Sequence, residues 1–313
     1  MAGSTAISQL LLWTKTVKYV DFQKVQLAQI KKHFLPIIRL FVPMIALSIY
    51  HFMDKTMLDL LSTEAEVGYY YAADKIIYIP LGLITAIGTV MLPRISSIVG
   101  ESKEKTEKLL SKSTELSICM SCAVGFGIAA IARVFVPLFF GEGYEKCVNL
   151  LVLFVPVLFV KSLSNVVDQQ YLIPAKCDNQ YTLAVTGGAI VNLICNGLLI
   201  PQLGSVGATL GTLMAELSVL IVSAHCAKKE IRFFRMFSRY SYYLLLGLIM
   251  FIAVRFFDSY SHIERSFIRL ILMIMIGGGV YSLLCLTVWL KVKEKSVFGS
   301  ILISLSKKGA IRK

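Results

Sequence analysis

The sequence places charged side chains inside segments that are otherwise apolar enough to cross a membrane. Asp54 and Lys55 close one such segment, and Asp74 and Lys75 lie within the next. A charge near the centre of a bilayer costs about 2.5–3.5 kcal/mol on insertion scales. Four of them facing lipid would cost roughly 10 kcal/mol, as much as the whole stability of a typical domain, about 5–15 kcal/mol. We therefore expect these groups to face a protein interior or a water-filled cavity.

Tyrosines accompany the charges in the second segment. Tyr70, Asp74 and Tyr78 recur every four residues, so they share one face of a helix. A tyrosine ring can stack on a sugar, while hydroxyl and carboxylate groups bond to its hydroxyls. The pattern therefore suits a sugar-binding wall, but an ion pair or a set of anchors near the outer membrane surface is an equally good interpretation.

Further ionisable residues follow in later apolar segments. Lys161, Asn165 and Asp168 form a polar stripe, and Glu216 stands alone in its segment. A lone intramembrane glutamate predicts either a proton-coupling site or a hydrogen-bonded structural residue. The candidate cavity residues are Asp54, Lys55, Tyr70, Asp74, Lys75, Tyr78, Arg133, Lys161, Asn165 and Asp168, and the candidate for ion coupling is Glu216.

Composition places the chain among membrane proteins. Its 313 residues are 56% hydrophobic, with a mean hydropathy of +0.72, far outside the range of soluble globular proteins. The formal net charge is +13, but the basic residues cluster between apolar segments. This distribution fits loops that follow the positive-inside rule. A nucleic-acid partner is disfavoured, because no basic, aromatic-rich soluble domain is present to bind one.

The sequence predicts no cofactor and no metal site. The seven cysteines are scattered and odd in number, and the four histidines show no metal-ligand spacing. Cys119 and Cys122 form a C-x-x-C, but within an apolar run where small residues tolerated in a packed membrane helix are the better interpretation. No nucleophile–base pair or phosphate-binding loop can be assembled either, which disfavours an enzyme.

The predicted fold is all-α, a polytopic membrane bundle of about eight transmembrane helices. The uncharged run from Tyr181 to Ala215 is too long for one span and is divided by a turn at Pro201–Gly207. The expected spans are Pro36–Met53, Val67–Leu92, Leu116–Pro137, Val148–Asp168, Thr182–Ile200, Gly207–Ala227, Tyr240–Phe257 and Phe267–Leu290. Prolines in or beside several spans predict bent helices around a polar cavity.

Composition divides the chain into three parts. Residues 1–33 are expected to hold the cytoplasmic end of a truncated helix and a basic interfacial linker. Residues 34–228 form a six-helix lobe, since five of its six spans carry an ionisable residue. Residues 229–313 add a basic loop, two more apolar spans and a basic tail. Small residues recurring every four positions, such as Gly188, Asn192 and Asn196, predict close helix packing.

The distribution of charge predicts the orientation in the membrane. Of the 32 Lys and Arg residues, 23 fall in the N-terminal linker, alternate loops and the C-terminal tail, whereas five fall in the opposite loops. This bias predicts a multi-pass membrane protein with its N-terminal linker and its C-terminus in the cytoplasm.

Three segments resemble a known family. They read FVPMIALSIYHFMDKTM (Phe41 to Met57), EVGYYYAADKI (Glu66 to Ile76) and PLGLITAIGTVMLPRIS (Pro80 to Ser96). They are similar to the second half of bacterial oligosaccharide flippases, in the multidrug/oligosaccharidyl-lipid/polysaccharide exporter superfamily. The resemblance implies a location in the bacterial cytoplasmic membrane. It also implies alternating-access transport of an undecaprenyl-pyrophosphate-linked sugar repeat unit from the inner to the outer leaflet of that membrane, for surface polysaccharide synthesis. Lys75 and Arg94 match recurring basic positions of the family.

The resemblance also implies a partner. Family members have two six-helix lobes around a cavity, often with two further helices that serve as a groove for the polyprenyl tail. Here the first lobe is expected to be missing except for its last turns, Ala6 to Val20. Besides the lipid bilayer and the lipid-linked glycan, the expected partner is therefore a separate first-lobe polypeptide or a second copy. Two other functions stay open, a drug or cation antiporter of the same superfamily and a non-transporting scaffold of a polysaccharide assembly complex.

Overall fold

The structure is a computed structural model that describes residues 52–261 and 265–292, with isolated positions between residues 9 and 48. The chain divides into two compact units, Met1–Val42 and Pro43–Lys313, and the fold described below is that of the second. The predicted N-terminal linker and nearly all of the first predicted span, Pro36–Met53, lie outside the described residues.

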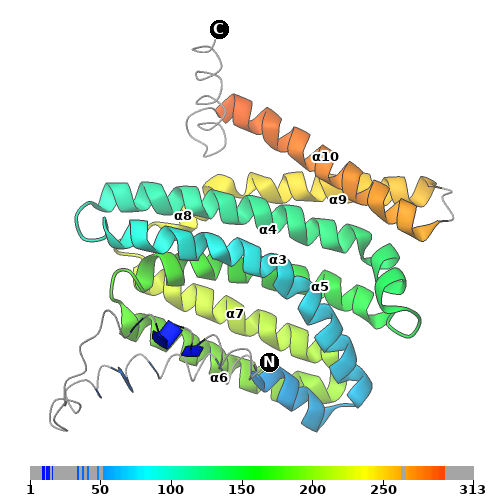
Figure 1. Cartoon of the computed structure of the whole chain (residues 1–313), viewed down its shortest axis with the longest axis horizontal. Coiled ribbons are helices and arrows are strands. Elements are labelled where there is room, and N and C mark those ends of the chain that lie inside the picture. Colours follow the sequence, from blue (N-terminus) through cyan, green and yellow to red (C-terminus); the bar gives the residue numbers. More distant parts are fainter. Residues whose placement is uncertain are drawn as a thin grey trace. The chain divides into compact units, whose positions relative to one another are not determined.

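Every regular element in the described residues is a helix. Residues 52–61 form one helical segment. The labelled helices (Figure 1) are α3 (Glu64–Ser96), α4 (Lys103–Phe140), α5 (Lys146–Val167), the π-helix η1 (Asp168–Leu172), α6 (Asp178–Leu203), α7 (Ser205–Ala227), α8 (Phe233–Tyr240), α9 (Tyr242–Tyr260) and α10 (Ser266–Val292).

The described residues contain seven helical segments that are long and apolar enough to cross a membrane. They coincide with the last seven predicted spans, so the prediction of an all-α polytopic membrane bundle is confirmed for this part of the chain. Short connections make consecutive spans antiparallel, and in Figure 1 the α3–α4 and α4–α5 connections lie at opposite ends of the bundle. We call the end that holds the connections 97–102, 173–177 and 228–232 the basic end.

Two boundaries differ from the prediction. Helix α4 begins at Lys103 instead of near Leu116. Its first turns are rich in Lys and Glu, which are good helix formers but lower the hydropathy from which spans are predicted. The predicted turn Pro201–Gly207 shrinks to Gly204 alone, which separates α6 from α7 with φ 57°. A side chain there would meet Glu66, so both the backbone angle and the close approach require glycine.

Small residues hold α6 and α7 together, as their four-residue spacing predicts. A Cβ atom at Gly188 of α6 would overlap Val219 of α7, and one at Gly211 of α7 would overlap Asn196 of α6. Helices in lipid have no hydrophobic driving force for association, so the van der Waals contacts made at such close backbone approach stabilise the pair instead. The paired helices can therefore present polar side chains at a fixed spacing.

Helices α9 and α10 pack on each other and on α4 (Figure 1). Tyr243 of α9 donates a hydrogen bond to the fully buried Glu115 of α4 and accepts one from Trp289 of α10. These contacts attach the last two helices to α4, away from α6 and α7. The division into a six-helix lobe and an appended pair at residue 228 stays a prediction.

Candidate functional site

The most densely bonded polar group in the described bundle is the carboxylate of Asp54. Its Oδ1 accepts hydrogen bonds from the side-chain amides of Asn192 (2.8 Å) and Asn196 (2.6 Å). Its Oδ2 accepts from the hydroxyls of Tyr70 (3.0 Å) and Thr212 (2.9 Å). The carboxylate is only 6% exposed, and four donors from α3, α6 and α7 offset the cost of removing it from water.

Of these four partners of Asp54, the sequence predicts only Tyr70 as a cavity residue. Asn192 and Asn196 were interpreted as packing residues, and Thr212 was not a candidate. Two asparagines one helical turn apart in an apolar helix share a face, and a buried amide needs a hydrogen-bond partner. That combination was the signal for a polar contact, but the sequence does not identify Asp54 as the acceptor.

Lys55 forms an ion pair with a residue of α3. Its Nζ lies 3.1 Å from Oδ2 of Asp74 and 4.4 Å from the ring centroid of Tyr71. The side chain of Asp74 is 9% exposed and that of Lys55 is 25% exposed. An ion pair at this depth keeps both charges in the bundle at a cost far below that of two isolated charges. Asp74 and Lys55 therefore form an ion pair, which is one of the interpretations that the sequence left open for Asp74.

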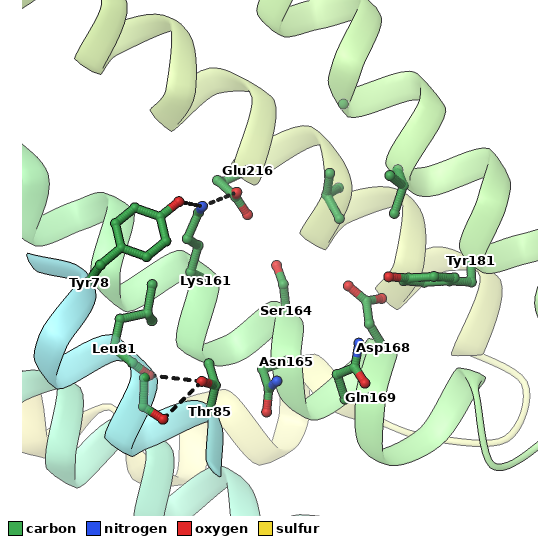
Figure 2. Close-up of a pocket in the computed structure, with 14 residues that line it drawn as sticks. Tyr78, Leu81, Thr85, Lys161, Ser164, Asn165, Asp168, Gln169, Tyr181 and Glu216 are labelled. Atoms are coloured by element: carbon green, nitrogen blue, oxygen red, sulfur yellow. Dashed lines mark hydrogen bonds and ion pairs between the residues drawn. The ribbon is translucent and has the colours of Figure 1, made fainter. Parts of the chain in front are cut away.

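A third polar centre is built around Lys161 of α5. Figure 2 shows its amino group between Tyr78 and Glu216. The Nζ atom donates to the Tyr78 hydroxyl at 2.8 Å and lies 3.0 Å from the carboxylate of Glu216. The two charged side chains are 11% and 8% exposed. Glu216 is thus half of a buried ion pair: it stands alone in its own segment, as the sequence shows, but its partner lies on another helix.

Two cavities meet at Lys161. One, of about 340 Å³, we call the Asp74 cavity; it is lined by Phe52, Asp54, Lys55, Tyr70, Asp74, Lys75, Tyr78 and Lys161. The other, of about 260 Å³, we call the Asp168 cavity (Figure 2); its polar lining is Tyr78, Thr85, Lys161, Ser164, Asn165, Asp168, Gln169, Tyr181 and Glu216. Because Tyr78 and Lys161 line both, they mark the boundary between the two spaces.

The Asp168 cavity contains buried polar atoms without a partner. Within the part of the chain that the structure describes, Ser164 Oγ and Asp168 Oδ1 make no hydrogen bond. Asp168 begins the π-helical turn η1, and such turns occur frequently at functional sites. An unsatisfied buried polar group costs about 1–3 kcal/mol. A ligand that donates hydrogen bonds, such as a sugar hydroxyl, would therefore be stabilised here.

The structure brings together all but one of the predicted site residues. Seven of them line the Asp74 cavity, and Tyr78, Lys161, Asn165, Asp168 and Glu216 line the Asp168 cavity. Arg133 is the exception: it is exposed on α4 and lines neither cavity. Among the described residues, no group of three or more His, Cys, Asp or Glu side chains could hold a metal ion.

These cavities combine three kinds of contact. Lysines supply positive charge, tyrosine rings supply flat faces, and carboxylate, amide and hydroxyl groups supply hydrogen bonds. Such a lining can bind a hydrated ligand that carries both hydroxyls and a negative charge, inside a bundle whose outer surface is apolar.

Comparison with known proteins gives a consistent result. The family model described as lipid II flippase MurJ matches residues 4–276. A putative O-antigen transporter of Escherichia coli K12 is 26% identical over 176 residues, which is 56% of this chain and 42% of the relative. The probable low-salt glycan biosynthesis flippase Agl15 of Haloferax volcanii is 22% identical over 241 residues, 76% of this chain and 50% of the relative. The chain thus spans about half the length of these relatives.

Two solved structures share the fold. The lipid II flippase MurJ in an inward closed conformation superposes with a TM-score of 0.71 and 17% identity, over 91% of this chain and 60% of the other. A multidrug resistance MATE family transporter of the MOP superfamily, in an outward-facing conformation, gives a TM-score of 0.51 and 19% identity, over 78% and 62%. At these identities the likeness establishes the fold.

Proposed function

The chain belongs to the lipid II flippase MurJ family, and on that premise we propose that it translocates a lipid-linked oligosaccharide from the inner to the outer leaflet for surface polysaccharide synthesis. The proposed carrier is undecaprenyl pyrophosphate. The single observation that carries the proposal is the tract of buried ion pairs and hydrogen-bonding groups that lines two adjoining cavities in an otherwise apolar bundle. The named relatives are transporters, which also argues against an enzyme.

The chemistry of the cargo fits this lining. Each sugar hydroxyl taken into hydrocarbon without a hydrogen bond would cost several kcal/mol, and the pyrophosphate far more. Lys55, Lys75 and Lys161 supply cations for the pyrophosphate. Asn165 and Asp168 supply hydrogen bonds for the sugars, while the prenyl chain stays in lipid. Alternating access then exposes the cavities to each side of the membrane in turn.

Glu216 gives this transport a point of control. While ionised, it holds Lys161 in a buried pair at 3.0 Å. Protonation of Glu216 would remove its charge and release Lys161 toward an anionic cargo. We therefore keep Glu216 as the ion-coupling candidate, acting through Lys161.

Charge distribution supports an orientation with the basic end in the cytoplasm. The connection 228–232 carries Lys and Arg, and so do the helix ends on both sides of the connection 97–102, as the positive-inside rule requires of cytoplasmic loops. A reporter fused after residue 313 should be active only if it is of the cytoplasmic type, such as a fluorescent protein. Activity of a periplasmic reporter at that position would reverse the orientation.

We further propose that transport requires a second helical body, either a separate first-lobe polypeptide or a second copy of this chain. Lys75 lines the Asp74 cavity yet is exposed, and Tyr78 is 38% exposed. A covering body would remove both from lipid. Coexpression with the first lobe of a flippase should then raise transport well above that of this chain alone.

Lys161→Gln tests the proposed function. The chain is expressed, with and without a first-lobe polypeptide, in a bacterium that lacks its own repeat-unit flippase, and surface polysaccharide is measured. The unchanged chain should restore the polysaccharide, and Lys161→Gln should abolish it at equal membrane abundance. Arg133→Gln is the matched control, because Arg133 is an exposed cation outside both cavities.

Other outcomes separate the alternatives. Full polysaccharide with Lys161→Gln would remove Lys161 from the transport path. No restoration by the unchanged chain under either condition, with normal recruitment of the other assembly proteins, would favour a scaffold. The lysines argue against a drug or cation antiporter, for which an acidic and aromatic cavity is expected.

A further inference from the structure

A basic groove separate from the transport cavities lies at the basic end of the bundle. It has a volume of about 560 Å³ and is formed by the first turns of α4 together with α8 and the residue before it. The charged residues that line it are Glu104, Glu107, Lys108, Lys112, Arg232, Arg235 and Arg239. None of them belongs to the sites described above.

The charges of this basic groove are unbalanced. Five cations face two glutamates, and in the described part of the chain neither glutamate forms an ion pair with any of the five. The groove therefore carries an excess of positive charge that the two glutamates offset only in part. A concave surface with one sign of excess charge concentrates ligands of the opposite sign.

The arginines are arranged to bind a phosphate. Arg235 and Arg239 lie one turn apart on the same face of α8, Arg232 is the residue immediately before this helix, and all three are exposed. The opposite face, which includes Met236 and Tyr240, is buried. Tyr240 is fixed by a hydrogen bond of 3.0 Å to Ser111 of α4. Guanidinium groups match phosphate oxygens in a bidentate geometry, and this packing holds the helix that carries Arg235 and Arg239 against α4.

The length of α4 places the groove at the level of the lipid headgroups. At about 1.5 Å per residue, its 38 residues extend for about 57 Å, whereas the hydrocarbon core is about 30 Å thick. The charged first turns therefore project beyond the acyl chains. Helix α8 leads directly into the membrane span α9, and Phe234 beside Arg235 is 60% exposed. Apolar and cationic side chains thus adjoin each other at this surface.

From these observations we propose that the basic groove binds the headgroup of an anionic membrane phospholipid. The phosphate lies among the three arginines, Lys108 and Lys112. The acyl chains follow the apolar surface that begins at Phe234 and continues along α9 with the exposed Leu245. A soluble phosphate would use the cations but leave the adjoining apolar surface without a role, so the lipid is the ligand that fits both features.

The test measures lipid binding to the purified full chain in detergent. Native mass spectrometry gives the apparent affinity for added phosphatidylglycerol and, separately, for phosphatidylcholine. The test variant carries Arg232→Gln, Arg235→Gln and Arg239→Gln. The control carries Lys105→Gln, Lys228→Gln and Lys229→Gln, which removes the same charge from exposed positions at the same end of the bundle but outside the groove.

Loss of three arginines should weaken phosphatidylglycerol binding about 100-fold, from roughly fivefold for each cation near an anionic lipid. The control should change it less than threefold, and phosphatidylcholine should bind weakly to all variants. Equal losses in both triple variants, or equal binding of the two lipids, would overturn the proposal. If the arginine variant fails to fold, Lys108→Gln with Lys112→Gln replaces it, with an expected loss of about 25-fold on the same scale.

Inorganic phosphate distinguishes the lipid from a soluble anion. Added at the concentration that saturates phosphatidylglycerol binding, it should leave the lipid bound. Displacement of the lipid by inorganic phosphate at that concentration would assign the groove to a soluble anion and refute the lipid assignment.

Discussion

Removing the Asp54 carboxylate should destabilise the bundle by an amount that its contacts define. Four donors bond to this carboxylate, but the hydroxyls of Thr212 and Tyr70 have other partners: Thr212 also donates to the Ala208 carbonyl, and Tyr70 lies 3.2 Å from the Thr212 hydroxyl. The Asn196 amide has two N–H groups, and besides Asp54 it donates to Asn192 Oδ1 at 3.1 Å. The amides of Asn192 and Asn196 depend on it most. Asp54→Ala therefore leaves chiefly these two amides without their acceptor.

The magnitude follows from hydrogen bonds measured in membranes. An interhelical hydrogen bond there averages about 0.6 kcal/mol, and a charged acceptor roughly doubles it. Two such bonds give a loss of about 2–3 kcal/mol in the free energy of unfolding for Asp54→Ala. Asp54→Asn keeps one acceptor oxygen for the two amides, and its NH₂ group replaces Oδ2 opposite the hydroxyls of Tyr70 and Thr212, which can accept as well as donate. We therefore expect a smaller loss, of about 1 kcal/mol.

The assay is reversible unfolding of the purified chain in mixed micelles, followed by circular dichroism. Asp59→Ala is the control, because Asp59 is an exposed carboxylate on the same helical segment and should change stability by less than about 0.5 kcal/mol. A stability of Asp54→Ala equal to that of Asp59→Ala would refute the reasoning. So would a larger loss for Asp54→Asn than for Asp54→Ala.

Three further changes have defined outcomes. Gly204→Ala should lower the free energy of unfolding by about 1–3 kcal/mol, since Gly204 has φ 57° and ψ −129°. Tyr243→Phe removes the hydrogen-bond donor to the buried Glu115 carboxylate and should cost about 1–2 kcal/mol in the same assay. Partial burial, followed by the nearby charge of Asp178, raises the pKa of Cys177. Its alkylation by iodoacetamide should therefore rise with pH through a midpoint above that of a free cysteine peptide, because less thiolate is present at each pH.

Each of these has a matched comparison. Gly68→Ala adds a methyl group in the first turns of α3, where the surrounding space is open. It should leave the free energy of unfolding unchanged or raise it. Tyr260→Phe changes an exposed tyrosine of α9 and should leave stability unchanged. For Cys177, peptide-resolved mass spectrometry isolates its rate from those of the other cysteines. A midpoint at or below that of the free peptide would contradict the predicted direction.

Periodicity and hydropathy were sufficient to predict the seven spans in the described residues, because each span must cross the hydrocarbon without help from its neighbours. The cost of burying charge in lipid also predicted that Asp54, Lys55, Asp74 and Lys75 would face a protein interior or a cavity, and all four line the Asp74 cavity. Both arguments use only free energies that belong to single residues or single segments. They required no knowledge of which helices adjoin.

The sequence does not show which side chains of different helices form pairs. Lys161 and Glu216 are separated by two helices along the chain, and nothing in their spacing shows that their side chains lie 3.0 Å apart. Asn196 looked like a small packing residue because its spacing serves packing and bonding equally well. Arg133 was placed among the cavity candidates because composition alone does not distinguish the inner face of a span from its outer face.

The position of Lys161 also affects the protein when no cargo is bound. A route joining the two cavities would pass the side chains of Tyr78 and Lys161, which line both. With the Lys161 amino group bonded to Tyr78 and close to Glu216, a hydrated sodium ion or a proton-carrying file of water would have to displace it to pass. Without a bound cargo, the protein would thereby keep the ion gradients across the membrane from leaking through it.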